Sequence, residues 1–171
     1  NPAAAEYHSN IGEAYRTLAR LNEAEASFQQ ALALNPASAE AMNNMGIVLQ
    51  TQGKLEEAVV LYRQAVALKP GYAQAHNNLG SALLAQGQVE EAATYFRQAL
   101  ALNPSYAGAH NNLGIVLQQE GLLSEAVAQY RQALLLDCTL AEAHANLGTV
   151  LQEQGKTEEA MDAYRQAIAV N

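Results

Sequence analysis

Apolar residues recur along this chain at helical spacing, in pairs of short segments. In residues 73–106 the first segment carries a stripe at i, i+3, i+4 and i+7, formed by His76, Leu79, Gly80 and Leu83. Gly87 interrupts this pattern, and a second stripe follows, formed by Val89, Ala92, Phe96 and Ala99. Pro104 ends the second segment, because proline disfavours a helical conformation in the residue before it. The pattern therefore predicts two helices that pack as an antiparallel hairpin.

The hairpin pattern repeats along the whole chain with a period of 34 residues. The repeats cover residues 5–38, 39–72, 73–106, 107–140 and 141–171, and the last is incomplete. A fixed period in this range is typical of a solenoid. We therefore expect an all-α fold in which about five helix-turn-helix units stack as one array over residues 1–171.

Small and aromatic residues occupy matching places in the repeats. The first helix carries Gly12, Gly46, Gly80, Gly114 and Gly148, and the second carries Phe28, Tyr62, Phe96, Tyr130 and Tyr164. A small residue beside an aromatic ring allows two helices to approach closely. Together with flanking alanines and Pro36, Pro70 and Pro104, this spacing resembles the tetratricopeptide repeat. The resemblance implies a right-handed superhelix and a role in protein–protein interaction.

The fourth and the first repeats each depart from this pattern, at different positions. Cys138 replaces the proline of the fourth repeat, so we expect the second helix of that repeat to run on or fray. Ala19 stands where the other repeats have Gly53, Gly87, Gly121 and Gly155, so we expect a less permissive turn between the first two helices.

Composition and charge narrow the range of functions. The net charge of -8, with only 9 Lys and Arg, argues against binding of nucleic acid or an acidic membrane surface. No apolar run reaches the roughly 18 residues that a membrane-spanning helix needs. The single cysteine, Cys138, excludes an internal disulfide framework and a thiolate zinc site. We expect a soluble protein without a cofactor, with the cytoplasm as its default location.

Polar residues form a second stripe on the first helices, opposite the apolar one. At 100° per residue, the middle of this stripe is asparagine in every repeat: Asn10, Asn44, Asn78, Asn112 and Asn146. One turn earlier the repeats carry Glu6, Glu40, Gln74, Gly108 and Glu142, and Asn43, Asn77 and Asn111 widen the stripe in the central repeats. Helix propensity does not explain these asparagines, because Asn competes for its own backbone.

A column of carboxamides suits the recognition of an extended peptide. Each amide has a donor and an acceptor, so it can pair with backbone N–H and C=O groups whatever side chain is attached. With repeats about 10 Å apart and an extended chain rising about 3.3 Å per residue, one Asn would meet roughly every third peptide residue. The alternative is that these asparagines tie neighbouring first helices together or face water.

The Asn column resembles the superhelix that precedes the catalytic region of O-linked N-acetylglucosamine transferases. In that family an Asn ladder holds the backbone of the protein substrate while a separate glycosyltransferase region modifies Ser or Thr. By this resemblance Asn10, Asn44, Asn78, Asn112 and Asn146 are ladder positions. Glu6, Glu40 and Glu142 match the family's acidic positions, whereas Gln74 and Gly108 do not. A free-standing scaffold for protein assembly, with no enzyme attached, is the alternative function.

Other kinds of site find less support in the sequence. His8, His76, His110 and His144 lie on the packing stripe, with neighbours about 10 Å apart, too far to share a metal ion, so we expect them to fill space. The inner stripe lacks the Lys and Arg residues that co-chaperone members of the family use to bind a terminal carboxylate. No nucleophile, base and orienting group can be assembled, so we expect no catalysis in this chain.

The two ends of the sequence suggest a longer array. Asn1-Pro2 repeats the pair that closes earlier repeats at Asn35-Pro36 and Asn103-Pro104, and the chain stops at Asn171, one residue before the next expected proline. We expect a piece of a longer solenoid whose exposed apolar ends favour self-association.

Overall fold

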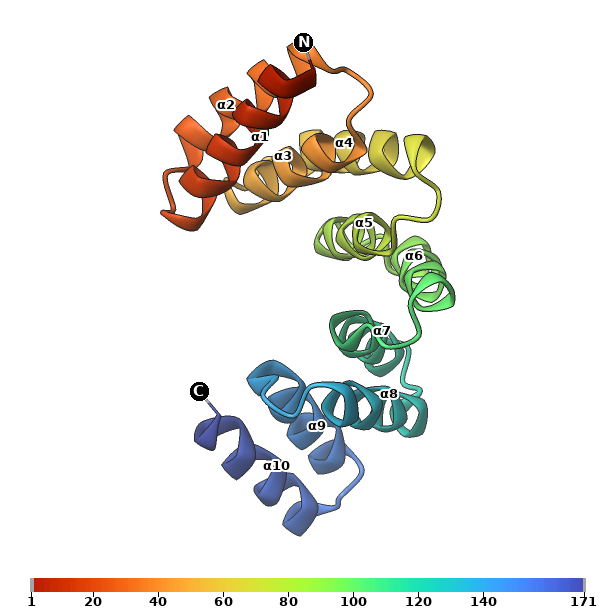
Figure 1. The fold of residues 1–171 in the computed structure, drawn as a ribbon. Helices are drawn as coiled ribbons and strands as arrows, with labels where there is room; N and C mark the ends of the chain where they lie inside the picture. The colour runs from red at the N-terminus through yellow and green to blue at the C-terminus, as the bar shows by residue number, and fades with distance from the viewer. Residues whose placement is uncertain (1, 171) are drawn as a thin grey trace. The chain divides into compact units, whose positions relative to one another are not determined.

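The computed structural model describes residues 2–170, with the side chain of Pro2 excepted. Within this range ten α-helices follow one another: α1 (Pro2–Thr17), α2 (Leu21–Leu34), α3 (Ala39–Thr51), α4 (Leu55–Leu68), α5 (Ala73–Ala85), α6 (Val89–Leu102), α7 (Ala107–Gln119), α8 (Leu123–Leu136), α9 (Ala141–Glu153) and α10 (Thr157–Ala169) (Figure 1). Asn1 and Asn171, on which the expectation of a longer array rests, lie outside the described residues.

The chain divides into two compact units, Asn1–Gln88 and Val89–Asn171. In unit 1 each of the helices α1 to α5 packs on the next, and in unit 2 the helices α6 to α10 do the same. First helices of successive repeats also contact one another, α1 with α3, α3 with α5, and α7 with α9. Unit 1 therefore holds two complete hairpins followed by α5, and unit 2 holds α6 followed by two complete hairpins. Within each unit the first helices form one wall.

The turn inside each hairpin has the same hydrogen bonding in all five repeats. The residue after the turn donates its backbone N–H to a carbonyl five residues earlier, as in Lys54 to Leu49 at 2.9 Å. This Schellman arrangement needs a left-handed residue, which is Gly53 with φ of 80° in the second repeat and Ala19 with φ of 55° in the first. Ala19 thus takes the glycine's conformation and bears the strain of an L-residue there.

Glycine on the first helix makes room for the aromatic ring of the second, as the sequence pattern predicted. A Cβ built on Gly46 would lie 2.6 Å from Cε1 of Tyr62, and one on Gly114 would lie 2.6 Å from Cε1 of Tyr130. Both rings are fully buried. The hairpin core therefore depends on the absence of a side chain at the glycine.

The second helix of the fourth repeat ends where the others do, so the expectation that it runs on or frays is wrong. Helix α8 stops at Leu136, and Asp137 caps it by donating its backbone N–H to Ala133 O at 2.8 Å. Asp137 Oδ1 then accepts from the backbone N–H of Thr139 at 2.9 Å and from its hydroxyl at 2.7 Å. This Asx turn stops the helix without a proline.

Candidate functional site: a polar groove on the first helices

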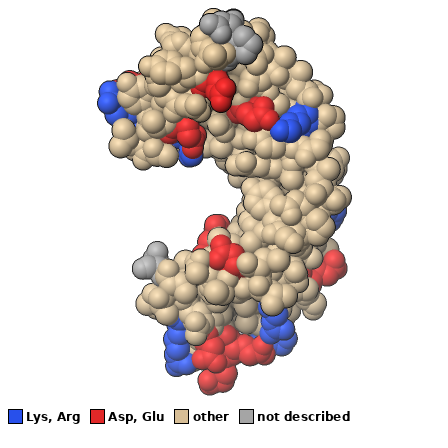
Figure 2. All heavy atoms as spheres, in the orientation of Figure 1, with Lys and Arg blue, Asp and Glu red and all other residues tan. Residues whose placement is uncertain are grey.

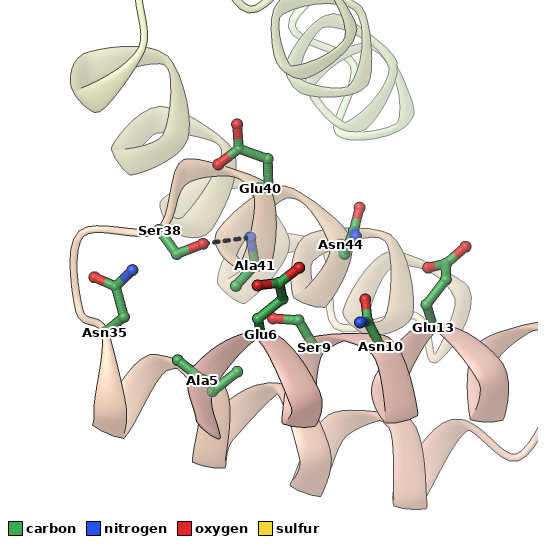
Figure 3. Close-up of a pocket in the computed structure, with 11 residues that line it drawn as sticks. Ala5, Glu6, Ser9, Asn10, Glu13, Asn35, Ser38, Glu40, Ala41 and Asn44 are labelled. Atoms are coloured by element: carbon green, nitrogen blue, oxygen red, sulfur yellow. Dashed lines mark hydrogen bonds between the residues drawn. The ribbon is translucent and has the colours of Figure 1, made fainter. Parts of the chain in front are cut away.

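A groove of about 420 Å³ lies in unit 1 between the first helices of the first two repeats (Figure 3). In Figure 3 the side chains of Glu6, Asn10 and Glu13 rise from α1 on the side that faces α3. The lining residues are Ala5, Glu6, Ser9, Asn10 and Glu13 from α1, Ala31 and Asn35 from α2 and its end, Ser38 before α3, and Glu40, Ala41 and Asn44 from α3. Four residues predicted from the sequence, Glu6, Asn10, Glu40 and Asn44, therefore meet in one cavity.

The carboxylates of the groove are partly neutralised by neighbouring cations. Arg16 donates to Glu13, and this hydrogen bond lowers the pKa of the Glu13 carboxyl. Lys69 donates to Glu40 and lowers the pKa of that carboxyl in the same way. Glu6 is exposed and makes no ion pair with any residue that the structure describes. The groove is thus acidic at neutral pH, but only weakly so.

Positive charge does not gather on the visible surface of either unit. Figure 2 shows Lys and Arg mostly beside Asp and Glu, with large uncharged areas between them. Lys54 with Glu25 and Arg131 with Glu159, each at 2.9 Å, are such pairs between successive repeats.

The ladder asparagines are accessible to different degrees. Asn10 is exposed, and Asn44, Asn78, Asn112 and Asn146 are half-buried. Asn10, Asn44 and Asn78 lie on α1, α3 and α5 of unit 1, and Asn112 and Asn146 lie on α7 and α9 of unit 2. Of the residues predicted one turn earlier, Glu40, Gln74 and Glu142 are exposed at the starts of α3, α5 and α9.

The neighbouring asparagines Asn43, Asn77 and Asn111 lie in the core, which corrects their expected place on the binding stripe. Their exposures are 0%, 7% and 2%. Asn43 Oδ1 accepts a hydrogen bond from Asn78 Nδ2 at 2.9 Å, and Asn111 Oδ1 accepts one from Asn146 Nδ2 at 3.1 Å. A rotation of 100° per residue turns the side chains of Asn43 and Asn111 away from the ladder face and toward the following repeat. They are too buried to touch a peptide directly.

Ser9, Asn35 and Ser38 line the groove but were not predicted as site residues. Ser9 precedes Asn10 on α1, while Asn35 and Ser38 lie in the connection to α3. Asn35 Oδ1 accepts the backbone N–H of Ala37 at 3.3 Å, and Ser38 Oγ caps α3 by accepting the N–H of Ala41 at 3.2 Å. An Asn-Pro turn followed by a serine N-cap was visible in the sequence as a local signal, but its position against α1 was not.

Three of the predicted histidines, His76, His110 and His144, form hydrogen bonds to the connections between repeats, a role that the space-filling expectation did not include. His76 Nε2 donates to Pro70 O at 2.9 Å, His110 Nε2 to Pro104 O at 3.0 Å, and His144 Nε2 to Cys138 O at 3.0 Å. Each imidazole therefore satisfies a backbone carbonyl in the turn that connects two repeats. Among the described residues, no group of three or more His, Cys, Asp or Glu side chains is placed to hold a metal ion.

A buried Tyr–Gln pair connects the hairpin core to the first-helix wall. Tyr62 Oη donates to Gln50 Oε1 and Tyr130 Oη to Gln118 Oε1, both at 3.0 Å, and burial raises the pKa of both phenols. The glutamines then reach the next repeat, Gln50 donating to Ser81 and Gln118 to Glu153. The wall is therefore held by side-chain bonds from repeat to repeat.

Family comparison agrees with this geometry over almost the whole chain. Family models of the tetratricopeptide repeat match residues 9–73, 43–107, 77–139 and 141–171. The chain belongs to the tetratricopeptide repeat family. A search of curated proteins found no match.

Solved structures with a similar fold are tetratricopeptide repeat proteins or share their architecture. TTC0263, a thermophilic TPR protein of Thermus thermophilus, is 26% identical with a TM-score of 0.84, over 97% of this chain and 91% of that one. PilF of Pseudomonas aeruginosa is 24% identical with a TM-score of 0.90, over 99% and 77%. YrrB, described as a TPR protein with an unusual peptide-binding site, is 25% identical with a TM-score of 0.71, over 96% and 84%.

Tetratricopeptide repeats make up nearly the whole of this chain. Because repeat models cover nearly all of it, the chain is a non-catalytic repeat module. In the part that the structure describes, no helix combines the length and apolar character needed to cross a membrane.

Proposed function

We propose that this tetratricopeptide repeat module binds an extended peptide or protein segment along its first-helix wall, through the ladder asparagines. The observation that carries the proposal is the groove of unit 1, in which Asn10 and Asn44 from two successive repeats line the same cavity. Its polar lining of amides, hydroxyls and carboxylates offers both donors and acceptors. Such a lining suits a peptide backbone better than an apolar ligand.

The ladder supports low selectivity for peptide side chains. Amides recognise the backbone, which every peptide shares, so affinity adds up over repeats instead of depending on one pocket. Glu6 lines the groove and has no ion-pair partner among the residues that the structure describes, so a basic side chain of the peptide is favoured beside it. YrrB, a protein of similar fold, is described as having a peptide-binding site.

The finer proposal is that the module recruits protein substrates for a glycosyltransferase of the O-linked N-acetylglucosamine transferase type. Its support is the asparagine found at the same place in all five repeats. The alternative is a scaffold for protein assembly with no enzyme attached. Sequencing the reading frame beyond Asn171 separates them. A nucleotide-sugar-binding α/β domain supports recruitment for glycosyl transfer, and an unrelated domain or a stop codon supports the scaffold.

Peptide binding is tested with a double substitution in the groove, Asn10→Ala with Asn44→Ala. The probe is a set of dodecapeptides selected by the wild-type protein from a random phage-displayed library and then synthesised. Each lost amide costs about 1 kcal/mol of binding, so we expect a Kd about 30-fold weaker by calorimetry.

The control is Gln30→Ala with Gln98→Ala, two exposed amides on second helices. We expect this protein to bind the same peptides with unchanged affinity. Failure to select any peptide, or wild-type affinity in the Asn10 and Asn44 variant, contradicts the proposal.

A further inference from the structure

We propose that the buried asparagines Asn43 and Asn111 are positioning residues, which orient the ladder amide of the following repeat and so decide which of its atoms faces a ligand. This inference rests on the proposed peptide binding by the ladder. Asn43 is 0% and Asn111 is 2% exposed, so neither can touch a ligand directly. The role proposed for them is indirect.

In unit 1 three carboxamides form a directed chain of hydrogen bonds. Asn78 Nδ2 donates to Asn43 Oδ1 at 2.9 Å, and Asn43 Nδ2 donates to Asn44 Oδ1 at 3.2 Å. A fully buried amide must satisfy its donor and its acceptor inside the protein, so Asn43 holds both neighbours. The direction of these two hydrogen bonds determines which atom of Asn44 and which atom of Asn78 is bonded to Asn43.

The two ladder residues bonded to Asn43, namely Asn44 at the groove and Asn78 on α5, therefore leave opposite atoms open. Asn78 donates one N–H to Asn43, and its carbonyl Oδ1 remains open to accept a hydrogen bond from a ligand. Asn44 Oδ1 accepts a hydrogen bond from Asn43, and both Nδ2 protons of Asn44 remain open as donors. The open Oδ1 of Asn78 therefore favours a donor on the ligand, and the open Nδ2 of Asn44 favours an acceptor. A peptide backbone carries both as C=O and N–H, whereas a polyanion or a purely apolar chain lacks the donor.

Unit 2 repeats the first half of this arrangement at the same sequence separation. Asn146 Nδ2 donates to Asn111 Oδ1 at 3.1 Å, across 35 residues, as Asn78 does to Asn43. Asn146 thus also keeps its Oδ1 for a ligand. The same contact in each unit shows that it belongs to the stacking of two repeats, and not to a local accident of α3 and α5.

The first repeat supplies a natural exception. Ser9 stands 35 residues before Asn44, at the place of Asn43 and Asn111, and its shorter side chain makes no hydrogen bond to Asn44 among the described residues. Asn44 is therefore held from its own helix and not from the repeat before it. Asparagine at residue 9 would recreate the missing bond, which offers a gain-of-contact variant at a half-buried position.

The free protein gives the first test, without any ligand. We expect Asn78 Nδ2 protons to exchange slowly with water in NMR spectra of wild type, and to lose this protection in Asn43→Ser, which copies the serine of repeat one. We expect Ser9→Asn to protect the Asn44 Nδ2 protons. Unchanged exchange of Asn78 in a folded Asn43→Ser protein, or of Asn44 in Ser9→Asn, overturns the inference.

Binding gives the second test, with the dodecapeptides selected by wild type as the probe. Ordering one side chain on binding costs enough to weaken affinity by about two- to tenfold, so we expect that loss for Asn43→Ser. Asn22→Ser, the same exchange at an exposed place on α2, serves as the matched control and keeps wild-type affinity. Circular dichroism melting confirms that both variants are folded at the assay temperature.

The outcomes separate this inference from the function on which it rests. Wild-type affinity in Asn43→Ser together with weak binding in Asn78→Ala overturns the positioning role and leaves peptide binding in place. Wild-type affinity in both overturns the ladder itself. A peptide whose backbone N–H is replaced by an ester oxygen at one position should bind Asn78→Ala and wild type equally when that N–H is the partner of Asn78. If wild type and Asn78→Ala bind the ester peptides with different affinity at every ester position tested, the assignment of Asn78 Oδ1 as the ligand-facing atom is overturned.

Discussion

At the scale of single residues, fit inside each hairpin depends on one missing side chain. Gly46 lies against the ring of Tyr62, whose hydroxyl is bonded to Gln50 and whose surface is fully buried. Such a ring has little room to move, because protein interiors are close-packed. The sequence revealed this contact through the repeated glycine and aromatic positions, since both recur with the same period.

We expect Gly46→Ala to destabilise the protein by about 1 to 3 kcal/mol, because the new Cβ would lie 2.6 Å from Tyr62 Cε1 and overpack the core. Chemical denaturation monitored by circular dichroism measures the change. Gly71→Ala is the matched control: no atom lies within 4 Å of its Cβ, so we expect a change within about 0.5 kcal/mol. Equal stability of the two variants would contradict the packing argument.

At the scale of elements, helix ends are set by polar side chains as much as by proline. Asn35, Asn103 and Asp137 each accept a backbone N–H two residues ahead, and all three follow a second helix of 14 residues. The prediction of an extended α8 failed because it considered the missing proline and not the Asx turn that precedes it. Asp and Asn compete with the helix for local backbone groups, which ends it.

Replacing Asp137 by alanine should let the end of α8 fray, because Thr139 N–H and its hydroxyl lose their acceptor. Hydrogen exchange of the amides from residue 136 to 140 should accelerate. Asp137→Asn keeps the acceptor oxygen and should preserve protection, as Asn35 and Asn103 do in their repeats. Faster exchange in both variants would show that the negative charge of Asp137, and not its acceptor oxygen, ends the helix. Unchanged exchange in both variants would show that the Asx turn does not end α8.

At the scale of the whole molecule, ionised carboxylates contribute to stability. Hydrogen bonds from cations lower the pKa values of Glu13, Glu25 and Glu40, with Arg16, Lys54 and Lys69 as the respective donors. A carboxyl whose pKa is lowered by folding stabilises the protein above its unfolded-state pKa. This contribution is lost as pH falls through the folded-state pKa. The cations themselves remain charged throughout this range.

We therefore expect the free energy of unfolding to be steady near neutral pH and to fall once the pH drops below about 4.5, the unperturbed value for Glu. Urea denaturation across this range measures it. Glu25→Gln should flatten the dependence, because the Glu25 side chain is 19% exposed, against 41% for Glu13 and 58% for Glu40, and its ion pair is therefore less screened by water. Glu90→Gln on the surface serves as control. A stability that rises on acidification would contradict the sign of these pKa shifts.

The sequence by itself determined the helical hairpins, their 34-residue period and the glycine–aromatic contacts, because all of these follow from spacing along one helix or one hairpin. It also placed Glu6, Asn10, Glu40 and Asn44 on one helical face per repeat, but it did not predict that Ser9, Asn35 and Ser38 line the same groove. Only the tertiary structure decided between adjacent asparagines. Asn43 and Asn44 differ by 100° of rotation, and contact with the following repeat buries one amide and leaves the other at the groove.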